Sequence, residues 1–240
     1  MELSVVVPAF NESHRLPATL ERILTYLSAR GERFEILVVD DGSTDDTATL
    51  AEGFSPRGVR VLRHPGNRGK GAALRTGVAA SLGEWVLLCD ADLATPIEEI
   101  ERLRAHAGDA DVVAGSRAVT DADIVRRQPF YREAMGRSFN LWLRLLGLTD
   151  LGDTQCGFKL LRGEAARQLF ARLTIERFAW DVELLQLARR EGLRVVEVGV
   201  VWRHEPESKV HPVRDSWGML LDSLRLRRRL GSHRRRRRGG

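Results

Sequence analysis

Short apolar runs alternate with segments of helical periodicity along the first half of the chain. A short apolar run at 3–8, followed by a polar turn, predicts a strand buried on both faces, and further strands are predicted at 34–39, 59–62, 85–89 and 111–116. Between them, apolar residues recur at helical spacing and predict helices at 13–30, 44–54, 71–82 and 97–106. This alternation indicates an α/β fold with a single Rossmann-like, mostly parallel sheet and helices on both faces.

The second half is less regular. Its pattern predicts helices at 132–148, 164–173, 181–190 and 213–230, and strands at 157–161 and 194–201. In the last helix, an apolar stripe keeps i, i+3, i+4, i+7 spacing through Trp217, Leu220, Leu221 and Leu224. We expect this stripe to face the protein core.

Polar side chains follow four of the predicted strands. These residues are Asn11 and Glu12, Asp40 and Asp41, Asp90 and Asp92, and Ser116 and Arg117. In an open α/β sheet, ligands bind outside the carboxyl ends of the strands. The sequence therefore predicts one site assembled from four strand ends.

The triplet Asp90-Ala91-Asp92 carries the strongest chemical signal at these strand ends. Side chains two residues apart on a strand project to the same side, and two neighbouring carboxylates repel unless a cation, a proton or an amine compensates them. Carboxylate oxygens suit Mg²⁺ or Mn²⁺, and Mg²⁺ is often held by one or two carboxylates plus substrate phosphate. Taken alone, the triplet also fits a solvated acidic turn.

Two further loops have both a structural and a functional interpretation. Residues 40–45 combine acids, Gly42 and a helix cap, so they form either a well-capped loop or acceptors for a base or ribose. Lys70 lies between two glycines before a predicted helix, where it contacts a phosphate or extends into solvent. The residues alone leave both choices open.

The charge is divided unevenly along the chain. Residues 225–240 contain nine arginines and no acid, whereas the first 224 residues hold 29 basic against 33 acidic side chains. A nucleic-acid-binding body is expected to be basic itself, and this one is mildly acidic. Two cysteines cannot form a disulfide framework and indicate a reducing compartment. No signal peptide and no run of about 18 uncharged apolar residues is evident, so we expect no membrane span.

Beyond these patterns, the chain resembles the family-2 glycosyltransferases over about residues 3–224. The matching stretches are VVVPAFNE at 5–12, VVDDGSTDDT at 38–47, NRGKGAALRTG at 67–77 and CDADLATP at 89–96. Within the family it is similar to the dolichyl- or polyprenyl-phosphate sugar synthases, through GSR at 115–117, DTQCGFKLL at 153–161, FAWDVELL at 178–185 and WRHEPESKV at 202–210. DADLAT and DTQCGFK favour the glucosyl branch over the mannosyl branch.

This resemblance implies a metal-dependent, inverting enzyme with the GT-A fold. It would transfer a hexose, with UDP-glucose as the favoured donor, to a polyprenyl or dolichyl phosphate. A GDP-mannose donor and a non-lipid acceptor remain as alternatives. The implied catalytic domain covers residues 1–224, with a donor half at about 1–117 and an acceptor half at about 118–224. Residues 225–240 then form a basic helix end and an arginine-rich tail.

The resemblance also implies roles for individual residues. Asp90 and Asp92 would bind the metal, Mg²⁺ or Mn²⁺, and would be catalytic together with Asp181 and Arg117. Arg117 and Arg132 would meet the acceptor phosphate, and Glu183 would lie near the sugar. The nucleotide-sugar would contact Pro8, Ala9, Glu12, Asp40, Asp41, Lys70, Asp90, Ala91, Asp92 and Lys209.

A lipid acceptor would place the protein at a membrane surface. The apolar stretch at 139–148 and the arginines from Arg225 onward suit contact with anionic lipid, and we expect a peripheral protein on the cytoplasmic face. One rival is a nucleic-acid-binding protein that uses Arg234–Arg238, although the segment lacks interleaved aromatic residues. Another is a nucleotidyltransferase, which also uses paired acids; the stretches at 5–12 and 40–45 argue against it.

Overall fold

The structure is a computed structural model that describes residues 1–126, 129–204 and 212–236, with side chains of the last helix described from 216 to 230. Lys209 lies outside the described residues. None of the described helices combines the length and hydropathy needed to cross a bilayer.

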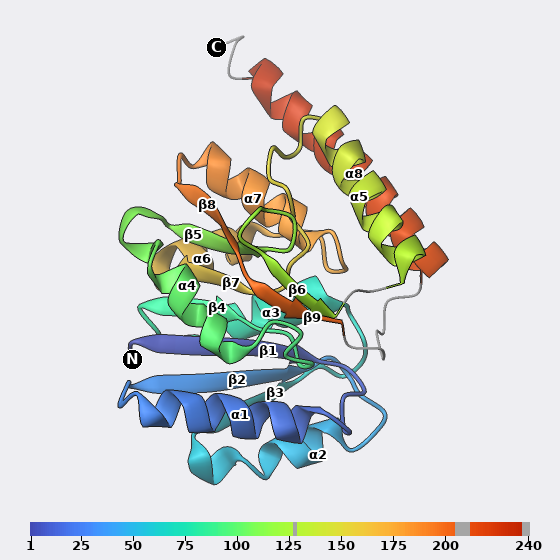
Figure 1. Cartoon of the computed structure of the whole chain (residues 1–240). Coiled ribbons are helices and arrows are strands. Elements are labelled where there is room, and N and C mark those ends of the chain that lie inside the picture. The colour runs from blue at the N-terminus through green and yellow to red at the C-terminus, as the bar shows by residue number, and fades with distance from the viewer. Residues whose placement is uncertain (127–128, 205–211, 237–240) are drawn as a thin grey trace.

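A seven-stranded sheet forms the centre of the molecule (Figure 1). Its strands, in spatial order, are β3 (Val59–Arg63), β2 (Phe34–Asp40), β1 (Leu3–Ala9), β4 (Trp85–Leu88), β7 (Lys159–Arg162), β5 (Val112–Ser116) and β8 (Val195–Gly199). All neighbouring pairs are parallel except those of β7, which runs antiparallel to β4 and β5. The predicted α/β architecture with a mostly parallel sheet is confirmed.

Helices cover both faces of this sheet because buried strand residues alternate between two cores. Val5, Ile36 and Leu87 face one core, and their neighbours Val6 and Leu37 face the other. The first core is covered by α1 (Leu16–Ala29), α2 (Thr47–Glu52) and α4 (Ile100–Arg104). The second core is covered by α3 (Lys70–Ala79), α6 (Gly163–Arg172) and α7 (Trp180–Arg190). Short 3₁₀ turns at Ser55–Arg57, Ile97–Glu99 and Ala107–Asp109 complete these layers.

The two remaining helices lie side by side, away from the sheet (Figure 1). They are α5 (Phe130–Leu145) and α8 (Pro212–Arg236). Leu143, Leu226 and Leu230 form a small third core with Val182 of α7, and Trp142 Nε1 donates a hydrogen bond of 3.0 Å to Ser223 Oγ. Strands β6 (Asp123–Arg126) and β9 (Val201–Arg203) form a separate two-stranded parallel sheet.

The last helix departs from the sequence prediction. Trp217 is 65% exposed and Leu221 is also exposed, so the expectation that their stripe faces the core is wrong. The helix instead buries Met219, Ser223 and the leucines at 226 and 230, because it packs against α5 rather than against the sheet. The helix runs from Pro212 to Arg236 and so passes through residue 224, as does the helix predicted at 213–230.

Candidate active site

A cleft of about 980 Å³ opens at the carboxyl ends of β1, β4 and β5. This volume lies at the upper end of the range for small-molecule sites. Eleven of the residues predicted to form the site line the cleft: Pro8, Ala9, Glu12, Asp41, Lys70, Asp90, Ala91, Asp92, Arg117, Arg132 and Asp181. The parallel strands therefore bring their polar ends to one place, as expected of an open α/β sheet.

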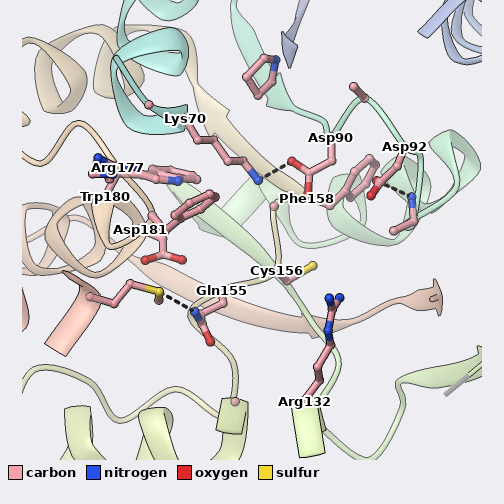
Figure 2. A pocket seen from close by; sticks show the side chains of 18 of the residues that line it. Lys70, Asp90, Asp92, Arg132, Gln155, Cys156, Phe158, Arg177, Trp180 and Asp181 are labelled. Atoms are coloured by element: carbon pink, nitrogen blue, oxygen red, sulfur yellow. Dashed lines mark hydrogen bonds and ion pairs between the residues drawn. The ribbon is translucent and has the colours of Figure 1, made fainter. Parts of the chain in front are cut away.

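Asp90 and Asp92 lie just beyond the end of β4, and each carboxylate has a different partner (Figure 2). Lys70 Nζ, at the start of α3, lies 2.5 Å from Asp90 Oδ1. Asp92 Oδ1 accepts a hydrogen bond of 3.0 Å from the backbone N–H of Ala94. Leu93, between Asp92 and Ala94, has a φ of 46°, which lies in the left-handed region.

The electrostatics of this pair suit a divalent cation. Burial and the charge of Asp90 raise the pKa of Asp92 to about 6. Burial would also raise the pKa of Asp90, but Lys70 outweighs it and holds that pKa below its ordinary value. The described residues contain no group of three or more metal-ligating side chains, so an ion held by Asp90 and Asp92 would take its other ligands from phosphate or water. The donor set fits Mg²⁺ or Mn²⁺ bound together with a diphosphate.

The backbone at Gly157 packs directly against Asp90. A Cβ atom at position 157 would lie 2.2 Å from Asp90 Oδ2 and 2.6 Å from its Cγ, which is far closer than real contacts allow. Only glycine therefore permits this approach of the loop before β7 to the acidic pair.

Asp41 holds the loop that leads to Lys70. Its Oδ2 accepts a hydrogen bond of 2.7 Å from the Gly69 N–H, and its Oδ1 accepts one of 3.0 Å from the Arg68 N–H. His64 Nδ1 lies 2.7 Å from the same Oδ1. Asp41 therefore shapes the loop that begins α3, in addition to lining the cleft.

Asp40 differs from the prediction because it does not line the cleft. It is buried as the last residue of β2, where Oδ1 accepts a hydrogen bond of 3.3 Å from the Ser43 N–H. Its Oδ2 lies 3.8 Å from the guanidinium of Arg63 and has no hydrogen-bond partner in the described structure. The strand alternation that turns Asp41 toward the cleft turns Asp40 away from it.

Two predicted arginines line the cleft, Arg117 directly after β5 and Arg132 on α5. Arg117 is paired with Asp153 through Nε–Oδ2 and Nη2–Oδ1 contacts of 2.6 and 3.0 Å, and its guanidinium stacks over Trp202 at 5.4 Å. Burial alone would raise the pKa of the Asp153 carboxyl group, but the guanidinium of Arg117 outweighs burial and lowers that pKa to about 2. Arg132 extends from α5 and forms no ion pair with any described residue (Figure 2).

Asp181 lies in the first turn of α7 and lines the cleft. Burial raises its pKa to about 6, and the charge of Lys159 opposes that shift. Lys159 is fully buried in β7, where Nζ donates hydrogen bonds to the carbonyl oxygens of Thr154 and Cys156. It thereby supports the turn that carries Gln155 and Cys156 into the cleft.

Glu183 lies away from the cleft, contrary to the expectation that it would be near the sugar. Its carboxylate is fully buried and accepts hydrogen bonds from the N–H groups of Thr174 and Ile175, at 3.0 and 2.8 Å, and it pairs with Arg229 of α8. Two residues along a helix turn through about 200°, so Asp181 and Glu183 point in different directions.

Several lining residues were not singled out from the sequence. They are Arg177 and Phe178 before α7, Trp180 at its first position, Gln155 in the turn before β7, and Trp202 and His204 at the end of β9. Most fall inside the motif stretches at 153–161, 178–185 and 202–210. These stretches indicated a functional segment but did not indicate which of its residues would line the cleft.

Comparisons with known proteins agree with this architecture. The family model for "Glycosyl transferase family 2" matches residues 4–170. The chain is 37% identical to the dolichyl-phosphate beta-glucosyltransferase of Dictyostelium discoideum, with 94% of this chain and 73% of that protein covered. It is also 37% identical to the human enzyme of that name, with 95% and 75% covered.

Among solved structures, glucosyl-3-phosphoglycerate synthase from Mycobacterium tuberculosis, crystallised with Mn²⁺ and UDP-glucose, superposes with a TM-score of 0.70. The match is 24% identical and covers 94% of this chain and 78% of that one. At that identity the likeness shows the shared GT-A fold alone. Because the family model matches more than half of its length, and because it is 37% identical to relatives of which it covers 73–75%, the chain belongs to glycosyltransferase family 2.

Proposed function

We propose that this enzyme transfers glucose from UDP-glucose to a polyprenyl or dolichyl phosphate, with inversion at the anomeric carbon. The observation that carries the proposal is the identity to dolichyl-phosphate beta-glucosyltransferases, which extends over 94–95% of the chain and so includes the acceptor half. The cleft supports it, because an acidic pair and arginines from the two halves of the chain line the same cavity.

The donor half would bind the nucleotide and its diphosphate. Pro8, Ala9, Glu12 and Asp41 border the part of the cleft assigned to the base and ribose. Asp90 and Asp92 would hold Mg²⁺ or Mn²⁺, which when bound supplies positive charge against the diphosphate. Lys70, at the first residue of α3, would add an ammonium and a helix N-terminus on the same side.

The acceptor half would guide a second anion toward the sugar. A phosphate oxygen of the acceptor attacks the anomeric carbon, the bond from that carbon to the UDP oxygen breaks, and UDP leaves with the electron pair. A phosphate monoester already carries about −1.5 to −2 charge at pH 7, so no strong base has to activate it. Arg132 and Arg117 would orient this phosphate, and Asp181 would contact the hexose.

The two helices outside the sheet suit the membrane surface where such a lipid resides. Apolar side chains are exposed on both: Phe130, Tyr131, Leu141 and Leu145 on α5, and Trp217 and Leu221 on α8. Exposed arginines at 225, 227 and 228 continue along α8. Apolar and basic residues together are typical of helices that lie on anionic lipid, and we place this surface on the cytoplasmic face.

A donor panel tests the proposal. Purified protein is incubated with radiolabelled UDP-glucose, UDP-galactose or GDP-mannose and a short polyprenyl phosphate, and product is extracted into organic solvent. We expect transfer from UDP-glucose, its loss with chelator, and a fall of at least about a hundredfold in Asp92→Asn. Transfer only from GDP-mannose would show that the proposed donor is wrong. Label that stays in the aqueous phase as a new glycoside would show that the proposed lipid acceptor is wrong.

Glu98→Gln is the matched control for the acidic pair. It also removes one carboxylate, but Glu98 is exposed on the protein surface and paired with Arg22. Its transfer rate is expected to equal that of the unmodified enzyme. A full rate in Asp92→Asn, with the same fold by circular dichroism, would contradict the assignment of the metal site.

A further inference from the structure

One contact in the cleft bears on how the donor and its metal arrive. Lys70 Nζ lies 2.5 Å from Asp90 Oδ1, and the two side chains are only 24% and 34% exposed (Figure 2). Asp90 is also the residue proposed to hold a divalent ion. The Asp90 carboxylate therefore has two candidate counterions, the ammonium of Lys70 and the divalent ion.

Asp90 has little freedom to serve both at once. The backbone at Gly157 packs against its carboxyl group on one side, and Lys70 contacts it on another. If they shared Asp90 Oδ1, an ammonium at this distance and a divalent ion at about 2.1 Å from the oxygen would lie within roughly 5 Å of each other. Like charges that close in a partly buried site repel strongly.

A bound diphosphate removes this conflict. Lys70 is the first residue of α3, whose N-terminal backbone faces the cleft through Gly69 and Lys70. A phosphate oxygen bound there would offer the ammonium a new anionic partner. Asp90 would then be available to the metal, and the positive charge of Lys70 would remain compensated.

We propose that Lys70 is an exchangeable counterion that couples metal binding to donor binding. In the free enzyme it neutralises Asp90 and weakens binding of a divalent ion on its own. When the nucleotide diphosphate is present, Lys70 pairs with phosphate and Asp90 is released, so ion and nucleotide bind cooperatively. This inference rests on the proposed function, because it requires the diphosphate and the metal to share the cleft.

Mn²⁺ titration followed by the electron paramagnetic resonance of the free ion tests the coupling without any turnover. Binding is measured with and without UDP for the unmodified enzyme and for Lys70→Met. In the unmodified enzyme we expect weak Mn²⁺ binding alone and a 5- to 150-fold gain with UDP, the usual range for coupled sites. In Lys70→Met, Mn²⁺ alone binds about tenfold more tightly, and the gain with UDP shrinks by at least the same factor.

Two variants separate the contact from general electrostatics. Arg68→Met removes a positive charge two residues away, but that side chain pairs with Glu176, and Mn²⁺ binding should stay as in the unmodified enzyme. Lys70→Arg keeps the charge and should keep weak binding of the ion alone. Unchanged or weaker Mn²⁺ binding in Lys70→Met, or equal tightening in Arg68→Met, overturns the inference. If the unmodified enzyme binds no Mn²⁺ even with UDP, the proposed metal site fails as well.

Discussion

Asp181 is a carboxylate kept in the cleft at a cost to stability. Only 3% of its surface is exposed, and burial raises its pKa to about 6 although Lys159 acts in the opposite sense. Between pH 4 and pH 6, the folded protein therefore holds a proton that the unfolded chain has lost. The free energy of unfolding falls as pH rises through this range, and above it the full cost of the buried charge is present.

Replacing this carboxylate with an amide should stabilise the protein at neutral pH. A shift of about two pKa units corresponds to about 3 kcal/mol as an upper estimate. We expect Asp181→Asn to raise the free energy of unfolding by about 1–3 kcal/mol at pH 7.5 and by less than about 0.5 kcal/mol at pH 4, as measured by urea denaturation. Asp109→Asn, at an exposed position, is the control and should show no such pH dependence. Equal stabilities of Asp181→Asn and the unmodified enzyme at pH 7.5 would refute this account.

Gly157 affects the acidic pair because its missing side chain leaves room for the Asp90 carboxyl group. In Gly157→Ala the new methyl group would have to displace the Asp90 carboxyl group, so the acidic pair would lose its geometry. We expect the transfer rate to fall at least about tenfold while the free energy of unfolding drops by only about 1–3 kcal/mol, as for other overpacked sites. Initial rates and thermal melts measure the two effects.

Gly108→Ala is the control for added bulk, since a Cβ there meets nothing within 4 Å. Its rate should equal that of the unmodified enzyme. An active Gly157→Ala would mean that Asp90 adapts without loss, and the close approach of the loop would then have no functional role.

At the scale of elements, the sequence predicted the buried strands of the first half well and missed parts of the second. Strands β1 to β5 are short, mainly apolar segments, and their ends fall within two residues of the predicted positions. Strand β6 was missed because Asp123–Arg126 is short and mostly exposed, so no apolar run marks it. Periodicity also carries no direction, so the antiparallel placement of β7 could not be predicted.

The candidate site was predictable to the extent that strand ends specify it. Glu12, Asp92 and Arg117, which follow β1, β4 and β5, line the cleft because strand order places them there. Whether Asp40 and Glu183 reach the cleft depends on the direction of each side chain. Nothing in the sequence distinguished them from the neighbouring acids Asp41 and Asp181. Lys159 was passed over because a lysine fully buried against backbone carbonyls has no signature in a linear sequence.

Helix α8 has two faces that should respond differently to mutation. Leu226 is 2% exposed in the third core, so Leu226→Ala should cost about 2–4 kcal/mol of unfolding free energy. Trp217→Ala, at an exposed position of the same helix, should change stability by less than about 0.5 kcal/mol but weaken binding to lipid vesicles. Chemical denaturation and vesicle co-sedimentation measure the two properties. Equal destabilisation by the two variants would show that Trp217 packs in the core after all.

At the scale of the whole molecule, charge is separated along the chain. The first 224 residues carry a small net negative charge, and the last 16 hold nine arginines. An acidic body is repelled by anionic lipid, whereas a basic end is attracted to it, so the separation would orient the protein on such a surface. Each arginine close to the membrane contributes about 1 kcal/mol, and the effect fades within a Debye length of about 8 Å at physiological salt.

Deleting residues 232–240 tests this orientation because it removes Arg234–Arg238 and keeps Leu226 and Leu230 of the third core. We expect binding to vesicles that contain phosphatidylserine to fall at least about tenfold, and binding to neutral vesicles to stay the same. Transfer to a short, water-soluble prenyl phosphate should be unaffected, since the cleft is intact. A variant with these five arginines changed to lysine should bind like the full chain. If the deletion instead abolishes binding to duplex DNA or RNA and leaves vesicle binding unchanged, the basic end serves nucleic acid and the proposed membrane contact by this segment is wrong.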